Sequence, residues 1–169
     1  VAWAKEKDIL LVNDNPYSFV LTNQPQSMMS VPGAMEVGME LNSLSKSFNM
    51  AGWRVGMVLG NEEIINAVLK VKSNMDSGMF YGIQQGAIAA LQAQESWFEK
   101  LNDIYRQRRK LIFELASLLN TDFDAHNSGL FVWAKMRDTS KSSVEYIEEI
   151  LQNHHIFIAP GSIFGSQGE

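Results

Sequence analysis

Residues 43–56 read SLSKSFNMAGWRVG, and this stretch does most to decide the fold. Apolar segments typical of β-strands flank it at residues 37–41 and 55–60. Lys46 therefore closely follows a predicted strand, and open α/β sheets bind their ligands where strands end. The stretch predicts an α/β fold with a lysine-bearing loop at the edge of a sheet.

Lys46 lies among groups that suit a carbonyl compound bearing a phosphate. A lysine that is partly buried near other cations loses its proton more easily, and its amine can then attack a carbonyl carbon. The hydroxyls of Ser43, Ser45 and Ser47 and the guanidinium of Arg54 can bind a phosphate dianion. A lone lysine in a serine-rich loop is usually an exposed surface residue, so the interpretation depends on what surrounds it.

A second group of candidates follows the apolar run at residues 9–12. This continuous run predicts a strand that is buried on both faces. The run stops at residues 13–16, NDNP, whose residue types are typical of a turn. Asp14 at the end of a buried strand needs a cation, because an isolated buried carboxylate is costly. A protonated pyridine nitrogen is one such cation, and Tyr17 follows three residues later.

Together, residues 14–17 (DNPY) and the stretch 43–56 closely resemble the cofactor signature of class I and II aminotransferases, which are fold-type I pyridoxal-phosphate enzymes. Residues 72–80 (KSNMDSGMF) and 83–84 look like the subgroup of aspartate, alanine and LL-diaminopimelate aminotransferases. Residues 128–133 are similar to a strand of the family's small domain. The resemblance runs along essentially the whole chain.

Five residues take roles that the resemblance implies. Lys46 would hold pyridoxal phosphate as a Schiff base and then carry a proton between the substrate Cα and the cofactor C4′. Asp14 would keep the ring nitrogen protonated, and Tyr17 would hydrogen-bond the phenolic oxygen of the ring. Ser43 and Arg54 would bind the phosphate, and the planar guanidinium can do so with two parallel hydrogen bonds.

The resemblance also implies how the chain is divided. Residues 1–100 would be the C-terminal part of the large three-layer α/β/α cofactor domain, and residues 101–169 a linking helix and a truncated small α/β domain. The family clamps the substrate carboxylate with an arginine near the end of the protein. The last arginine here, Arg137, precedes the final predicted helix and does not match it. We therefore expect the 169 residues to be inactive by themselves.

The activity that the resemblance implies is transfer of an amino group between an amino acid and a 2-oxo acid, as part of amino-acid metabolism. The family builds its site at a dimer interface, which implies a homodimer for the parent protein. Other fold-type I enzymes, such as carbon–sulfur lyases and ACC-synthase-like enzymes, share the lysine and the phosphate-binding residues and stay open as alternatives.

Two further classes are weaker alternatives. The spacing Ser43-x-x-Lys46 also fits the acylating pair of penicillin-recognising enzymes, but their Ser-x-Asn and Lys-Thr-Gly-like elements are not found in the sequence. A non-catalytic relative that keeps only the fold is a third reading. The intact set of Asp14, Tyr17, Lys46 and Arg54 argues against it.

Composition narrows the class of protein. With 46% hydrophobic and 20% charged residues, the chain can fold around a sizeable core. A net charge of −5 gives no reason to expect nucleic acid or a membrane as partner, and no run approaches the roughly 20 apolar residues of a spanning helix. The charged start does not fit a signal peptide and cysteine is absent, so a cytoplasmic protein is expected. No metal site is expected, since His154 and His155 are adjacent and His126 stands alone.

The remaining pattern predicts helices and a second α/β unit. Asn61, followed by two glutamates, marks the start of one helix, and an apolar stripe from residue 98 to 119 marks a longer one. Residues 142–145 (SSVE) form a predicted capping box for a last helix. That helix lies between two predicted strands, at residues 130–134 and 156–159.

Overall fold

The computed structural model describes residues 1–22 and 24–169, which form two compact units. Unit 1 consists of Val1–Arg106 with Ser128–Leu130, and unit 2 of Gln107–Asn127 with Phe131–Glu169. The elements are, in chain order, α1 (Ala2–Lys7), β1 (Leu11–Asp14), η1 (Met28–Ser30), α2 (Ala34–Val37), β2 (Gly38–Ser43), α3 (Leu44–Ser47), η2 (Ala51–Trp53), β3 (Gly56–Gly60), α4 (Glu62–Met75), α5 (Tyr81–Leu91), α6 (Glu95–Leu118), β4 (Thr121–Phe123), β5 (Ala134–Met136), α7 (Ser143–His154) and η3 (Gly161–Phe164). This mixture of helix and sheet confirms the predicted α/β class.

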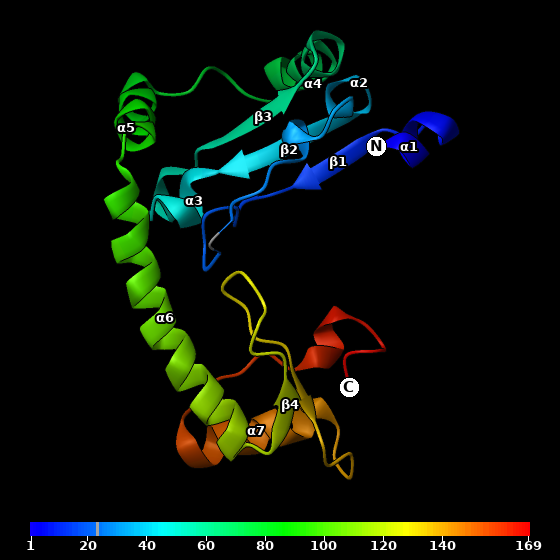
Figure 1. Ribbon diagram of the computed structural model, residues 1–169. Helices are drawn as coiled ribbons and strands as arrows, with labels where there is room; N and C mark the ends of the chain where they lie inside the picture. The colour runs from blue at the N-terminus through cyan, green and yellow to red at the C-terminus, as the bar shows by residue number, and fades with distance from the viewer. Residues whose placement is uncertain (23) are drawn as a thin grey trace. The chain divides into compact units, whose positions relative to one another are not determined.

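Unit 1 contains a three-stranded sheet in the order β1-β2-β3 (Figure 1). β1 runs parallel to β2, and Asp14 at the end of β1 lies opposite Leu41. β3 runs antiparallel to β2, and Gly56 at its start lies opposite Ser43 at the end of β2. These directions bring the carboxyl ends of β1 and β2 and the amino end of β3 to the same edge of the sheet.

The first strand differs from its prediction in position and in burial. β1 begins at Leu11 and not at Ile9, because Leu11 lies opposite Gly38, the first residue of β2, and the chain before Gly38 is helix α2. The prediction that this strand is buried on both faces is wrong, since 52% of the Val12 surface is exposed. An apolar run shows that a strand forms, but burial of its second face needs a covering layer.

The core of unit 1 joins α3 and α5 to the sheet. Its buried side chains, and those packed around them, are Leu44, Met50, Val55, Ala87, Phe48, Met57, Ile83 and Ala90. Gly86 allows α5 to approach η2, because a Cβ atom there would lie 2.4 Å from a ring carbon of Trp53. Packing of this kind is needed to hold the four-residue α3, which is far too short to be stable by itself.

Helix α4 starts as predicted at Asn61. The Asn61 side chain accepts a hydrogen bond from the Ile64 N–H at 2.9 Å and donates one to the Met35 carbonyl oxygen at 2.9 Å. One side chain thus caps α4 and ties its start to α2. Two glutamates in the first turn further favour the helix through its dipole.

The predicted long helix is confirmed as α6, with 24 residues. At its start, the Phe98 ring stacks on Phe19 with 5.0 Å between centroids and meets Phe48 edge-on at 5.4 Å. Length alone does not make α6 a membrane helix: within residues 1–22 and 24–169, no helix is both long and apolar enough to cross a bilayer.

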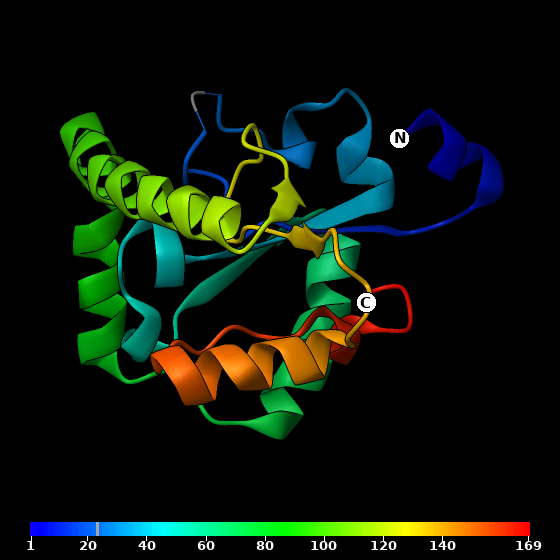
Figure 2. The same cartoon turned by 90° about the horizontal axis from the view of Figure 1, so that it is seen from below.

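Unit 2 is built from a two-stranded antiparallel sheet and α7. The rings of Phe113 and Phe123 stack at 4.9 Å, and the Tyr146 hydroxyl in α7 donates to the Leu119 carbonyl oxygen at 3.2 Å. The predicted capping box is present between Ser142 and Glu145. Figure 2 shows α7 in orange with the red η3 segment next to it.

Two strands predicted for this part of the chain are wrong. The strand expected at residues 130–134 is Ala134–Met136 instead, and residues 156–159 do not form a strand. In the described part of the chain this sheet has two strands, with Thr121–Phe123 paired to Ala134–Met136, and residues 156–159 pair with neither of them. Phe157, which was expected inside that last strand, is instead 74% exposed.

We expect Asn61→Ala to lower the free energy of unfolding of the complete protein by roughly 1–2 kcal/mol, because the cap and the bond to Met35 are both lost. Chemical denaturation measures this. Asn66→Ala is the matched control, because Asn66 is exposed inside the same helix. It should be neutral or slightly stabilising, since alanine favours helix. Equal losses in both variants would contradict the capping role.

Candidate functional site

The five residues singled out by sequence lie on three segments that meet at one edge of the sheet. Asp14 is the last residue of β1, and Tyr17 follows in the next loop. Ser43 ends β2 and caps α3, which contains Lys46. Arg54 follows η2 and stands two residues before β3. Pairing of the three strands therefore gathers residues that are up to 40 positions apart in the chain.

The pleat of the sheet places Asp14 and Ser43 on the same face. Side chains alternate between faces along a strand and directly paired residues share a face, so Asp14, its partner Leu41 and then Ser43 lie on one side. Val12 lies on this side too, and with Asp14 it is exposed. The face that carries two of the candidates is open in the described part of the chain.

Lys46 is held in a short, well-anchored helix. Its neighbours Leu44 and Ser47 are each only 1% exposed, and the Ser47 carbonyl oxygen accepts a bond from the Trp97 indole N–H at 3.2 Å. The Lys46 side chain itself is half-buried. Anchoring on both sides fixes the backbone from which the lysine projects, as a covalent attachment point needs.

Ser43 joins β2 to the loop before β3. Its hydroxyl accepts from the Ser45 N–H at 3.1 Å and donates to the Val55 carbonyl oxygen at 3.3 Å, while the Leu44 N–H donates to the same oxygen at 3.2 Å. These bonds extend the contact between β2 and β3 past the end of the ladder. Arg54, immediately before Val55, is thereby kept close to α3.

Arg54 has a left-handed backbone, with φ 56° and ψ 48°. This conformation is uncommon for a residue with a side chain and is often found at functional sites, where the surrounding fold enforces it. The guanidinium is exposed, and its Nη1 donates to the Ala51 carbonyl oxygen at 2.8 Å. That contact uses a single donor of the guanidinium, which has five.

The loop that carries Tyr17 is fixed by Asn102, a residue that the sequence reasoning missed. The Asn102 amide accepts from the Leu21 N–H at 2.8 Å and donates to the Phe19 carbonyl oxygen at 2.9 Å. Asn102 is only 9% exposed although it is polar. A polar residue within the apolar stripe of α6 was the signal that could have found it.

Glu40 is a second residue that the sequence reasoning missed. It is 2% exposed, and its carboxylate accepts four hydrogen bonds, from Asn13, Asn15, Ser27 and the Met28 N–H. Burial alone would raise the pKa of Glu40, but the bonds from Asn13 and the other donors outweigh it and hold this pKa below the ordinary value. A glutamate in the middle of an apolar strand was the available signal.

The chemical groups at the sheet edge fit pyridoxal phosphate. The set contains an amine for the aldehyde carbon, a carboxylate for the ring nitrogen and a phenol for the ring oxygen. A guanidinium and a hydroxyl are available for the phosphate. Metal ligands are another matter: within the described residues, no three histidine, aspartate or glutamate side chains are grouped so as to hold an ion.

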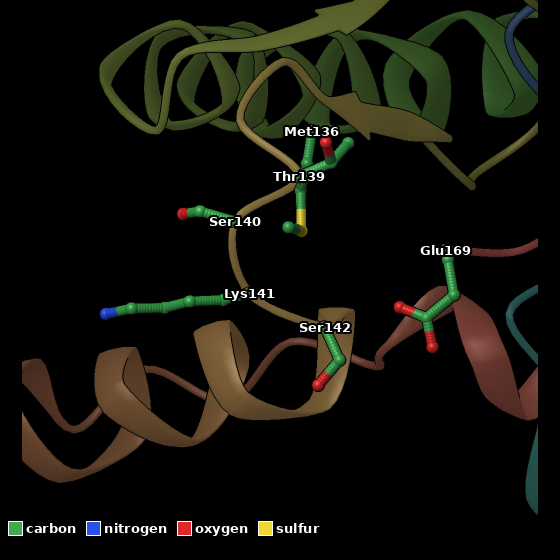
Figure 3. Close-up of a pocket in the computed structure, with 6 residues that line it drawn as sticks. All are labelled: Met136, Thr139, Ser140, Lys141, Ser142 and Glu169. Carbon is green, nitrogen blue, oxygen red and sulfur yellow. The ribbon is translucent and has the colours of Figure 1, made fainter.

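A separate hollow lies in unit 2 (Figure 3), and its lining residues are Met136, Thr139, Ser140, Lys141, Ser142 and Glu169. None of the five candidates is among them. Its lysine, Lys141, forms an exposed salt bridge with Glu149. The hollow therefore adds nothing to the site at the sheet edge of unit 1.

Comparison with known proteins agrees with this set of groups. The sequence matches the family described as aminotransferase class I and II over residues 1–169. The LL-diaminopimelate aminotransferase of Aquifex aeolicus is 38% identical over 171 residues, and that of Gloeobacter violaceus is 40% identical over 171 residues. Each alignment covers 100% of this chain and 44% of the relative. The chain thus spans less than half the length of these relatives.

Solved structures give the same result for the fold. The apo structure of BacF from Bacillus subtilis has a TM-score of 0.89 at 38% identity and covers 99% of this chain and 45% of its own. An aromatic aminotransferase from Pyrococcus horikoshii has a TM-score of 0.88 at 27% identity. This match covers 99% of the present chain and 46% of the aromatic aminotransferase. The fold is that of part of a fold-type I aminotransferase, as predicted, and enzymes of this family depend on pyridoxal phosphate.

If Arg54 binds the phosphate, Arg54→Gln in the complete protein should weaken pyridoxal phosphate binding by roughly 10- to 100-fold, since a hydrogen bond to a charged group contributes about 1.5–3 kcal/mol. Absorbance titration of the apoprotein measures this. Pyridoxal, which lacks the phosphate, should bind the parent and the variant alike. Arg108→Gln, at an exposed position of α6, is the control and should change neither affinity. Equal weakening for both ligands would argue against a phosphate contact.

Proposed function

The chain belongs to the class I and II aminotransferase family, and we propose that the complete protein moves an amino group from an amino acid to a 2-oxo acid with pyridoxal phosphate as cofactor. One observation carries the proposal: three strand ends bring Asp14, Ser43, Lys46 and Arg54 to a single edge of the sheet, with Tyr17 in the adjoining loop. Each of these residues has a functional group that suits one part of this cofactor: its aldehyde, its ring nitrogen, its ring oxygen or its phosphate.

Lys46 performs the covalent and proton-transfer work in this proposal. Its amine would hold the cofactor through the aldehyde carbon, with loss of water, and would be set free when the amino group of the substrate takes its place. As a free amine, Lys46 would then act as the general base and acid that moves the substrate Cα proton. When bound, pyridoxal phosphate supplies a ring that stabilises negative charge at the substrate Cα.

The other four residues hold the cofactor in the orientation that Lys46 needs. Asp14 accepts a hydrogen bond from the ring nitrogen and keeps that nitrogen protonated by its negative charge. Tyr17 donates to the ring oxygen next to the reactive carbon. Ser43 and Arg54 bind the phosphate, where the guanidinium adds charge as well as hydrogen bonds.

The proposed activity is tested with the complete protein, pyridoxal phosphate, a panel of amino donors and 2-oxoglutarate as acceptor. The relatives named for LL-diaminopimelate make this diamino acid the first donor to try. We expect more than one equivalent of 2-oxo acid per active site to form only when an acceptor is present, because the acceptor must take the amino group before a second donor can react. Release of ammonia or a thiol without any acceptor would favour a carbon–sulfur lyase instead.

Lys46→Ala should reduce turnover by roughly 1000-fold or more, because it removes both the attachment point and the proton carrier. Lys70→Ala is the matched control, since Lys70 is an exposed lysine of α4, and it should leave turnover unchanged. Borohydride reduction of the cofactor-loaded parent should label the peptide that contains Lys46. A label on another lysine would reject the assignment.

We also propose a homodimer and a cytoplasmic location for the complete protein. The resemblance supports both, because it is to enzymes of amino-acid metabolism that build their site at a dimer interface. The stretch from the end of α4 to the start of α5 offers a candidate contact surface, because Met75, Phe80 and Tyr81 are 76%, 74% and 69% exposed. Exposed apolar groups of this kind often mark protein–protein contacts.

Phe80→Glu should convert the dimer to a monomer at micromolar concentration, because a charge placed in an apolar contact is left without a partner. Light scattering coupled to size-exclusion chromatography measures the mass. Phe157→Glu changes a phenylalanine that is also 74% exposed, but in unit 2, and should leave the mass unchanged. A dimeric Phe80→Glu protein would place the interface elsewhere.

A further inference from the structure

The two asparagines that bind Glu40 are the immediate neighbours of Asp14 in the chain. The Asn13 amide donates to Glu40 Oε2 at 3.0 Å, and the Asn15 amide donates to Glu40 Oε1 at 3.2 Å. Side chains alternate along a strand, so these two point to one face while Asp14 points to the other. The segment that carries Asp14 is therefore tied on both sides to one buried carboxylate.

The end of β1 needs such a tie. β1 pairs only with β2 in the described sheet, and Asp14 is its last residue. Backbone at the end of a strand opens more easily than backbone in its middle. After Asp14, the bond from the Asn15 N–H to the Leu41 carbonyl oxygen at 2.8 Å continues the ladder.

We propose that Glu40 is a positioning residue for Asp14: through Asn13 and Asn15 it fixes the strand end that presents Asp14 to the ring nitrogen of pyridoxal phosphate. This inference rests on the proposed function. Glu40 lies on the opposite face of the sheet from Asp14, so it acts through the backbone between the two asparagines and touches neither substrate nor cofactor.

A carboxylate is needed at this position because all of its partners are donors. Oε2 accepts from Asn13, from the Ser27 hydroxyl at 2.9 Å and from the Met28 N–H at 2.7 Å, which leaves Oε1 for Asn15. Beyond these contacts, none of the salt bridges within the described residues includes Glu40. The carboxylate is therefore stabilised by hydrogen-bond donors from two segments, the end of β1 and the start of η1.

Glu40→Gln replaces one carboxylate oxygen by an NH₂ group, so it affects the bond to Asn15 differently from the three bonds to Oε2. The amide oxygen can occupy the Oε2 position and keep three bonds, but the NH₂ group then faces the Asn15 amide, which is also a donor. Asn15 cannot simply turn its amide over, because the same nitrogen donates to the Gln26 carbonyl oxygen at 2.9 Å. The substitution thus releases Asn15 selectively.

The test uses the complete protein loaded with pyridoxal phosphate that carries ¹⁵N at the ring nitrogen. In Glu40→Gln, we expect the ring-nitrogen resonance to move towards that of the unprotonated ring, and kcat to fall roughly tenfold with little change in KM. The matched control is Glu36→Gln, since Glu36 is a largely exposed glutamate of α2 that pairs with Lys5. It should behave like the parent protein.

A second variant shows whether Glu40 acts through Asn15. Asn15→Ala should move the resonance in the same direction, and the double variant should move it no further than the larger single change. Fully additive shifts, or an unmoved resonance in Glu40→Gln, would overturn the positioning role. If Glu40→Gln does not fold, Asn15→Ala tests the same contact from its other end, and an unmoved resonance there is equally decisive.

Asp14→Asn separates this inference from the function on which it rests. If Asp14→Asn moves the ring-nitrogen resonance while Glu40→Gln does not, Asp14 holds the ring but Glu40 does not position it. If Asp14→Asn leaves the resonance in place, or the parent protein does not bind pyridoxal phosphate, the proposed function itself fails.

Discussion

The pairing of β2 with both of its neighbours is the constraint on which the candidate site depends. β2 runs parallel to β1 and antiparallel to β3, so two strand ends and one strand start meet at a single edge. The register then decides the detail: because Asp14 lies opposite Leu41, it shares a face with Ser43. A shift of one residue in β1 would turn Asp14 to the other face and separate it from the Ser43 hydroxyl.

Two buried polar side chains hold the loops around that edge. Glu40 accepts hydrogen bonds from the residues on either side of Asp14 and so fixes the end of β1. Asn102 bonds to the backbone of the loop after Tyr17. Buried polar groups are costly unless they are hydrogen-bonded, and Glu40 has four such bonds and Asn102 two. An apolar residue could fill the same space but could not fix the direction of a loop.

The errors in the sequence-based predictions share one cause. Residues 9–12, 130–134 and 156–159 all have the apolar composition of strands, yet β1 starts two residues late, β5 four residues late and the last segment forms no strand. Composition records how well a residue suits extended backbone, whereas a strand exists only where another strand lies alongside with free N–H and C=O groups. Helices were predicted better because their hydrogen bonds stay within the segment.

The sequence by itself determined the local features: the cap at Asn61, the capping box at Ser142, the long helix, and the motif around Lys46 that indicates the family. Each depends on residues within a few positions of one another, so a single stretch contains the whole signal. Only the tertiary structure decided that Asp14 and Ser43 share a face and that Glu40 binds the neighbours of Asp14. Those relations join segments some 25 to 30 residues apart, and strand register, which no short stretch encodes, sets them.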